Sequence, residues 1–136
     1  MAALSEPMHY DYRGLANEVS TTASAMTDVY KGAMMVYDPA TGKIAFPTDV
    51  ADAAIAGVYR GQDDDTHTFL DGDLIVLDMT EVFVPDAGAA QTDAGKYGYV
   101  ATTGDWTLTA GAKTRTVLCT KVEVGVGRWI SFLDRR

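Results

Sequence analysis

The sequence predicts a small all-β domain, a β-barrel or β-sandwich of about eight to ten short strands preceded by an extended N-terminal arm. Three observations predict it. From residue 29 onward, apolar and polar residues alternate over short runs, turn residues interrupt these runs about every 8–12 residues, and no amphipathic helical pattern is sustained. The 136 residues are 47% hydrophobic, which is enough for one folded core.

Residues 1–28 are predicted to be an arm with little structure of its own, and residues 29–136 to be the β domain. The apolar residues of the arm show no strand alternation, and the serines and threonines of residues 20–24 disfavour a helix. Tyr10 and Tyr12 are amphipathic side chains of a type enriched at protein interfaces. A contact arm, a frayed terminus and an intramolecular edge strand remain alternatives for this segment.

The first predicted hairpin follows the arm. Residues 31–37 form a short apolar run, and residues 43–46 alternate again. Between them, Pro39 presets φ and Gly42 permits a positive φ, as a turn requires. Residues 50–54 are predicted as one helical turn.

The middle of the chain predicts a strand, an acidic loop and a second strand. Residues 53–60 form the first strand, with Gly57 as a bulge inside it. Residues 61–67 are an exposed acidic loop. Residues 74–79 follow the turn Asp71-Gly72-Asp73 and are apolar on both faces, which predicts burial on both sides or an oligomer seam.

The remaining strands follow a turn or bulge near Thr80-Glu81. They are predicted at residues 82–84, 96–102, 106–110, 117–124 and 128–133. Polar connections occupy residues 86–95 and 111–116, and Gly125-Val126-Gly127 joins the last two strands as a hairpin. In the first strand of this hairpin Leu118, Val122 and Val124 are predicted to share a face, and in the second strand Ile130 and Phe132 are predicted to share one.

Composition excludes several function classes. The net charge of −8 repels phosphates and anionic lipids, so we expect neither nucleic acid nor a membrane as partner. No apolar run approaches the roughly 20 residues of a membrane span, and the N-terminus does not read as a signal peptide. A single cysteine allows no intrachain disulfide, and Cys119, His9 and His67 are too far apart to indicate a metal site.

No set of residues predicts catalysis, so we expect the protein not to be an enzyme. His67 lies beside Asp63, Asp64 and Asp65, but the G-x-S-x-G nucleophile motif is absent. The acidic loops lack the calcium pattern D-x-[DN]-x-[DN]-G, and no nucleotide-binding glycine motif occurs. We therefore predict no cofactor and no metal. Cys119 is predicted to be a buried structural thiol.

The aromatic residues admit several interpretations. Trp106, Tyr97 and Tyr99 could form a sugar-binding platform, although such residues more often belong to a core or a subunit interface. Trp129, next to Ile130, is predicted to be core. For Tyr97 and Tyr99 both core and interface stay open. The tail cations Arg135 and Arg136 either pair with carboxylates of a neighbouring subunit or are solvated.

A succession of short segments from residue 29 to about residue 133 resembles a known family. In chain order they are Gly32-Ala33-Met34-Met35-Val36, Gly42-Lys43-Ile44-Ala45-Phe46, Ala54-Ile55-Ala56-Gly57-Val58, Gly72-Asp73-Leu74-Ile75-Val76-Leu77, Val82-Phe83-Val84, Ala94-Gly95-Lys96-Tyr97-Gly98-Tyr99-Val100, Val122-Glu123-Val124 and Trp129-Ile130. The order and spacing resemble the capsid decoration, or head cement, proteins of tailed bacteriophages. Lys96 stands where an aspartate is more usual in that pattern, and the connection at residues 111–116 is longer than is typical.

The resemblance implies a virion structural protein that binds the outer surface of an assembled capsid and stabilises it. The implied partner is the major capsid protein, and the implied state is a homotrimer at three-fold or quasi-three-fold positions, on particles assembled in the host cytoplasm. It also implies an arm that becomes ordered on the capsid, with contacts from Met8, His9, Tyr10, Tyr12, Arg13 and Leu15. The candidate subunit interface consists of Tyr97, Tyr99, Arg135 and Arg136. Alternatives are another virion component (a head fibre base, neck or tail protein) and a carbohydrate-binding β module.

Overall fold

The computed structural model describes residues 4, 17–48, 53–61, 64–109 and 116–132. These residues form twelve strands and one short 3₁₀ helix. The strands are β1 (Asn17–Thr22), β2 (Met26–Tyr30), β3 (Met34–Tyr37), β4 (Ile44–Ala45), β5 (Ala54–Tyr59), β6 (Thr66–Phe69), β7 (Leu74–Met79), β8 (Glu81–Pro85), β9 (Tyr97–Thr102), β10 (Asp105–Thr107), β11 (Thr116–Glu123) and β12 (Gly127–Ser131), with η1 (Gln91–Asp93) between β8 and β9. The predicted all-β class is therefore confirmed.

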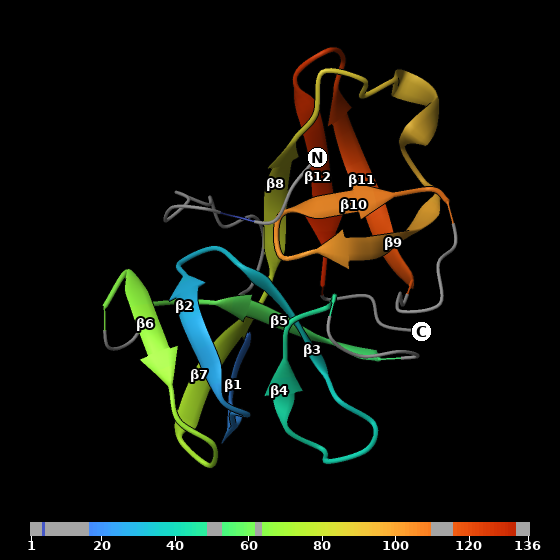
Figure 1. Ribbon diagram of the computed structural model, residues 1–136. Helices are drawn as coiled ribbons and strands as arrows, with labels where there is room; N and C mark the ends of the chain where they lie inside the picture. The colour runs from blue at the N-terminus through green and yellow to red at the C-terminus, as the bar shows by residue number, and fades with distance from the viewer. Residues whose placement is uncertain (1–3, 5–16, 49–52, 62–63, 110–115, 133–136) are drawn as a thin grey trace.

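The strands form three antiparallel sheets (Figure 1). The N-terminal sheet has the order β1-β7-β5-β3-β4, the C-terminal sheet has the order β10-β9-β11-β12-β8, and β2 and β6 form a small sheet. Each five-stranded sheet has a different strand at each edge, so neither closes into a barrel within the described residues. Of the two predicted architectures, the sandwich is the one that fits.

Two hydrophobic cores lie on opposite faces of the N-terminal sheet. On one face Met34, Ile55 and Val58 pack with the apolar side chains of the C-terminal sheet, which include Trp106 and Phe132. The other face packs against the small sheet through a different set of side chains, namely Met35, Ile44, Ala56, Tyr59, Ile75 and Leu77. Strands β3 and β5 are therefore buried on both faces, which is why their sequences are apolar without interruption.

The first predicted hairpin is present as β3 and β4. The two strands pair antiparallel, with Val36 opposite Ala45 and Tyr37 opposite Ile44. In the connecting turn Gly42 has φ +71° and donates its N–H to the carbonyl of Asp38 at 2.7 Å. The helical turn predicted at residues 50–54 falls largely outside the described residues, and Ala54 begins β5.

The bulge predicted in the next strand is confirmed. Gly57 of β5 has φ +153°, and the pairing of β5 with β3 shifts at this point. A Cβ atom at position 57 would lie 2.9 Å from the carbonyl oxygen of Asp78 on the neighbouring strand β7. Only glycine allows the two backbones to approach this closely.

Strand β7 differs from the two-sided burial that its sequence predicts. Ile75 and Leu77 enter the core shared with the small sheet. On the other face Leu74 is 62% exposed and Val76 is half-buried, whereas Asp78 is buried. The predicted break near Thr80-Glu81 is where the chain leaves the N-terminal sheet and enters the C-terminal sheet as β8.

The final hairpin is confirmed as β11 and β12, but the predicted face of β11 is wrong. The pairing of β11 with β12 shifts between Cys119 and Lys121, so a bulge at Thr120 changes the alternation. Val117, Cys119 and Val122 therefore enter the core, while Leu118 is half-buried and Val124 is 65% exposed. Ile130 and Phe132 share the core face, as predicted.

Three of the twelve strands, β1, β2 and β6, are not among the predicted strands. Strand β1 pairs with β7 at the edge of the N-terminal sheet, and β2 pairs with β6. The prediction of an arm is therefore wrong for residues 17–28, and the edge-strand alternative describes Asn17–Thr22. The rest of the predicted arm lies outside the described residues apart from Leu4.

The acidic residues Asp64 and Asp65 are exposed, as predicted, whereas His67 belongs to β6.

Candidate interaction surfaces

The predicted interface residues are only partly described by the structure. The arm residues Met8, His9, Tyr10, Tyr12, Arg13 and Leu15, and the tail residues Arg135 and Arg136, lie outside the described residues. Tyr97 and Tyr99 are both on β9. Tyr97 is 40% exposed and Tyr99 is half-buried.

Both tyrosines lie on the face of the C-terminal sheet that points away from the shared core. Along β9 the buried residues Gly98 and Val100 alternate with them, and Val100 belongs to the core. The antiparallel pairing places Leu118 of β11 opposite Tyr97. We call this surface the outer face and define it by Phe83, Tyr97, Tyr99, Leu118 and Trp129.

Phe83 and Trp129 form the other half of the outer face. They are opposite each other on β8 and β12, and their ring centroids lie 5.4 Å apart. The indole Nε1 of Trp129 donates a hydrogen bond to the Glu123 carboxylate at 3.1 Å. Trp129 is 8% exposed and thus buried, as predicted, but it lies outside both core clusters.

Trp106 cannot contribute to a sugar-binding platform. Its side chain is 1% exposed and lies in the core between the sheets. Its Nε1 donates to the carbonyl of Val117 at 3.4 Å, and a Cβ atom at Gly98 would lie 2.3 Å from its ring. Of the three residues predicted for such a platform, only Tyr97 and Tyr99 reach the surface.

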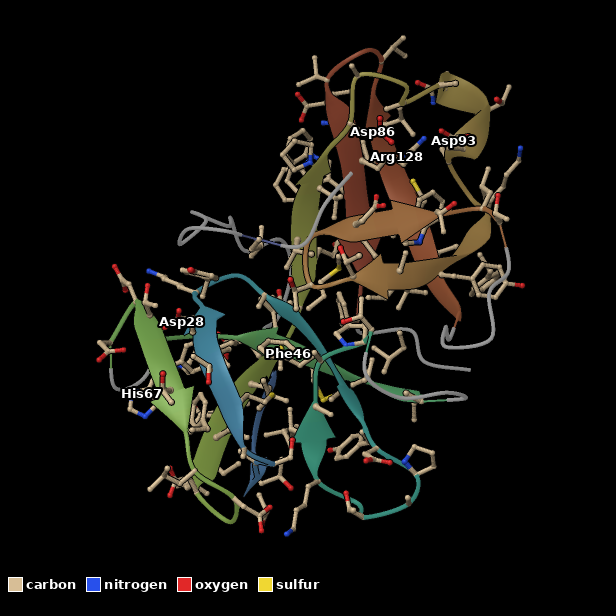
Figure 2. The ribbon with its side chains drawn as sticks, in the orientation of Figure 1. Asp28, Phe46, His67, Asp86, Asp93 and Arg128 are labelled. Carbon is tan, nitrogen blue, oxygen red and sulfur yellow. The ribbon has the colours of Figure 1, made fainter. Side chains whose placement is uncertain are left out.

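A buried charge network closes one end of the C-terminal sheet (Figure 2). Arg128 on β12 donates from Nε to Asp93 at 2.8 Å and from Nη1 to Asp86 at 2.6 Å. Its guanidinium carbon also lies 5.1 Å from the centroid of a Trp106 ring. Arg128 and Asp93 are both more than nine-tenths buried.

The same carboxylates organise the connection between β8 and β9. Asp86 accepts a hydrogen bond from the N–H of Gly88 at 2.8 Å, and Asp93 accepts one from the N–H of Ala90 at 3.0 Å. These backbone donors, together with Arg128, lower the pKa of both carboxyls. Burial alone would lower the pKa of Arg128, but its hydrogen bonds to Asp93 and Asp86 raise it overall. All three groups are therefore charged at neutral pH and hold the fold together.

Sequence reasoning missed this network, although a signal for it exists. Arg128, Ile130 and Phe132 alternate on one face of the last strand, and the last two are core residues. A cation in register with core residues indicates a buried ion pair. The sequence gives no means of choosing Asp86 and Asp93 among the 19 acidic residues.

A second set of charged side chains connects the edge strand β1 to the rest of the N-terminal sheet. Arg60, which follows β5, pairs with Glu18 on β1. Its Nε also lies 3.9 Å from the buried carboxylate of Asp78 on β7. Because Asp78 and Glu18 are opposite each other in the pairing of β7 with β1, this group attaches the edge strand to the sheet.

His67 of β6 and Cys119 of β11 both lie on strands. His67 Nδ1 lies 3.5 Å from Asp64, and its ring packs edge-on against Phe69 at 4.5 Å. Among the described residues, no three His, Cys, Asp or Glu side chains are placed to hold a metal ion. Cys119 is fully buried, as predicted, and burial raises the pKa of its thiol.

The described part of the chain contains no helix with the length and apolar character that crossing a membrane requires.

No protein-family model and no curated protein sequence matches this chain.

Proposed function

We propose that the protein is a virion structural protein that binds the outer surface of an assembled tailed-phage capsid and stabilises it. The observation that carries the proposal is the outer face, where Tyr97 is 40% exposed beside the half-buried Tyr99 and Leu118. Tyrosine and other aromatic residues are enriched at protein interfaces, because they supply contact area together with a hydrogen-bonding group. The segment order that resembles capsid decoration proteins supports the same function.

The placement of the charged residues is consistent with a binding role. The buried ions Arg128, Asp93 and Asp78 are each engaged with oppositely charged side chains of the fold itself. Large apolar side chains are also exposed, at Leu70, Leu74, Tyr97, Leu108, Val124 and Val126. Exposed apolar and aromatic side chains offer area for contact with another protein.

The proposed partner is the major capsid protein, and the proposed assembly is a homotrimer on the outside of the virion. Binding to the assembled lattice and not to its dissociated subunits would stabilise the shell by mass action. A protein acting in this way needs no cofactor and no catalytic group.

Co-sedimentation with expanded heads that lack this protein tests the proposal. The purified full chain should bind the heads saturably and raise the temperature at which they release DNA. Tyr97→Ala should weaken binding by at least about tenfold if Tyr97 is a central contact. Leu70→Ala, which removes an exposed apolar side chain at another place in the fold, should leave it unchanged. Absence of co-sedimentation at saturating concentration would contradict the proposal.

Two other functions remain candidates. Another virion role, such as a head fibre base, neck or tail component, would use the same apolar surface, and electron microscopy of labelled particles would place the label away from the capsid faces.

The exposed Tyr97 also favours a carbohydrate-binding module. Saturable shifts of the Tyr97 and Tyr99 ring resonances with members of a glycan panel would support that function over capsid binding.

A further inference from the structure

A pocket of about 250 Å³ lies where the N-terminal strands meet the turn between β9 and β10. Asp28 and Tyr30 of β2 contribute to its wall, together with Ala33 and Phe46. Thr103 contributes from the turn of the C-terminal sheet. Figure 2 labels Asp28 and Phe46, which come from segments far apart in the sequence.

The backbone at Asp28 has an unusual conformation. Asp28 has φ +54°, and it is the only residue other than glycine with a positive φ in the described part of the chain. Residues 27 and 28 lie between the paired positions Met26 and Val29, where the register with β6 shifts. This bulge interrupts the pairing of an otherwise regular strand and redirects its side chains, so that both bulged residues line the pocket.

The carboxylate of Asp28 is available to a ligand. The backbone N–H of Asp28 donates a hydrogen bond to the Thr68 hydroxyl oxygen at 3.3 Å. Within the described part of the chain, no hydrogen bond or ion pair involves its side-chain oxygens. This contrasts with Asp38, Asp71, Asp73, Asp86 and Asp93, each of which has a bonded carboxylate.

The size and lining of the pocket restrict what can occupy it. A volume of 250 Å³ is below the range of about 300–1,000 Å³ that is typical of sites for cofactors and drug-sized ligands. At about 30 Å³ per water it has room for about eight waters, which is comparable with the five to seven non-hydrogen atoms of a lysine or arginine side chain. Ala33 and Phe46 provide apolar contact for a methylene stem, and Asp28 provides a negative charge.

We propose that this pocket receives a lysine or arginine side chain from an extended segment of a partner polypeptide. The methylene groups pack on Phe46 and Ala33, and the cation pairs with the Asp28 carboxylate. The net charge of −8 favours the approach of a basic segment. This inference goes beyond the proposed capsid binding and does not depend on it, because none of the residues that line the pocket belongs to the outer face.

Titration of the full chain, followed by amide NMR, tests the proposal. The probes are acetylated and amidated Gly-Gly-Lys-Gly-Gly, its arginine counterpart, and the same peptide with norleucine in place of lysine. We expect saturable shifts with the two basic peptides, confined to amides at the pocket such as Asp28, Ala33 and Thr103. Norleucine keeps the stem but not the charge. Because Asp28 is exposed to solvent, the affinity of the norleucine peptide should be about two- to fivefold lower.

Two variants provide the matched comparison. Asp28→Asn removes the charge but retains a residue that tolerates positive φ, so it should fold normally and bind the basic peptides about two- to fivefold more weakly. Asp65→Asn makes the same change on an exposed loop residue outside the pocket lining and should bind as the wild type does. Thermal unfolding of both variants checks that the fold is retained.

Three outcomes would overturn the proposal. One is the absence of saturable shifts with either basic peptide. Another is equal binding of the norleucine peptide, or an equal loss in Asp28→Asn and Asp65→Asn. The third is binding of free propylamine as tight as that of the lysine peptide, which would indicate a site for small amines instead of a polypeptide.

Discussion

At the scale of single residues, Arg128 is a buried cation with several partners. It lies at a core-facing position of β12, where an unpaired charge would be costly. Asp86 and Asp93 compensate its charge, and Trp106 covers one face of its guanidinium group. Removing one partner of a buried ion pair leaves the other charge without compensation, which typically costs more than the intact pair contributes.

Asp93→Asn should therefore lower the free energy of unfolding by about 3 kcal/mol. The change leaves the shape of the side chain but removes the charge that is closest to Arg128 Nε. Asp71→Asn is the control, because Asp71 pairs with Lys43 at an exposed site and should contribute less than about 1 kcal/mol. Urea denaturation of the two variants and the wild type measures both effects, and equal losses would contradict a special role for the buried network.

The same network predicts how stability depends on pH. Folding lowers the pKa of Asp86 and Asp93, so in acid the unfolded chain binds more protons than the folded chain. The stabilisation is complete above the unfolded pKa of about 4 and is lost as the pH falls through the lower folded pKa. The difference in unfolding free energy between wild type and Asp93→Asn should thus be constant from pH 7 to about 5 and should shrink below about 4. Thermal unfolding over this range measures it, and a constant difference down to pH 2 would be the opposite result.

Cys119 provides a further test at this scale. The chain has a single cysteine, and its thiol is fully buried, with burial raising its pKa. A thiol reagent such as dithionitrobenzoate should therefore react with the native protein far more slowly than with protein in denaturant, where one thiol per chain should react. Rapid labelling of the native protein would show that Cys119 is accessible.

At the scale of elements, bulges determine which faces of the strands are buried. The bulge at Gly57 brings β5 close to β7, and the bulge at Thr120 shifts β11 so that Val122 faces the core. The first bulge is marked in the sequence by a glycine, Gly57, which has a positive φ in the structure. The second has no such residue, which explains why alternation alone placed Leu118, Val122 and Val124 on one face.

Gly57→Ala should destabilise the protein by about 2 kcal/mol or more. The added methyl group would lie 2.9 Å from the Asp78 carbonyl oxygen and 3.1 Å from the Leu77 Cβ, and neither can move without displacing β7. Ala54→Gly, at the exposed start of the same strand, should cost only about 0.5–1 kcal/mol from the backbone entropy of glycine. Chemical denaturation compares them, and equal effects would contradict the close approach of β5 and β7.

At the scale of the whole molecule, the N-terminal sheet links the two cores. Met34 and Met35 are adjacent in β3 but enter different cores, and Ile55 and Ala56 of β5 do the same. Met34 also donates its backbone N–H to the carbonyl of Thr103 at 2.8 Å, which joins β3 to the C-terminal sheet. Because the same two strands complete both cores, we expect the described parts to unfold together.

Met34→Ala tests this cooperativity. It should lower the free energy of unfolding by about 2–5 kcal/mol, as for other large-to-small substitutions in a core. Both tryptophans, Trp106 and Trp129, lie in the C-terminal sheet, so their fluorescence reports on that sheet, whereas circular dichroism reports on all strands. The two probes should give coincident transitions in wild type and variant. Separate transitions would show that the sheets unfold independently.

The sequence by itself determined the all-β class, the β3–β4 and β11–β12 hairpins, the bulge at Gly57 and the burial of Cys119. These features follow from local chemistry, since alternation, glycine φ and turn residues act within a few positions. Only the tertiary structure decided that β1 is an edge strand on β7 and that Arg128 pairs with Asp93 and Asp86, which are 35 and 42 residues away. It also brought Asp28 and Phe46 to one pocket. Such choices depend on which strands meet, and nothing in the residues next to each partner specifies that.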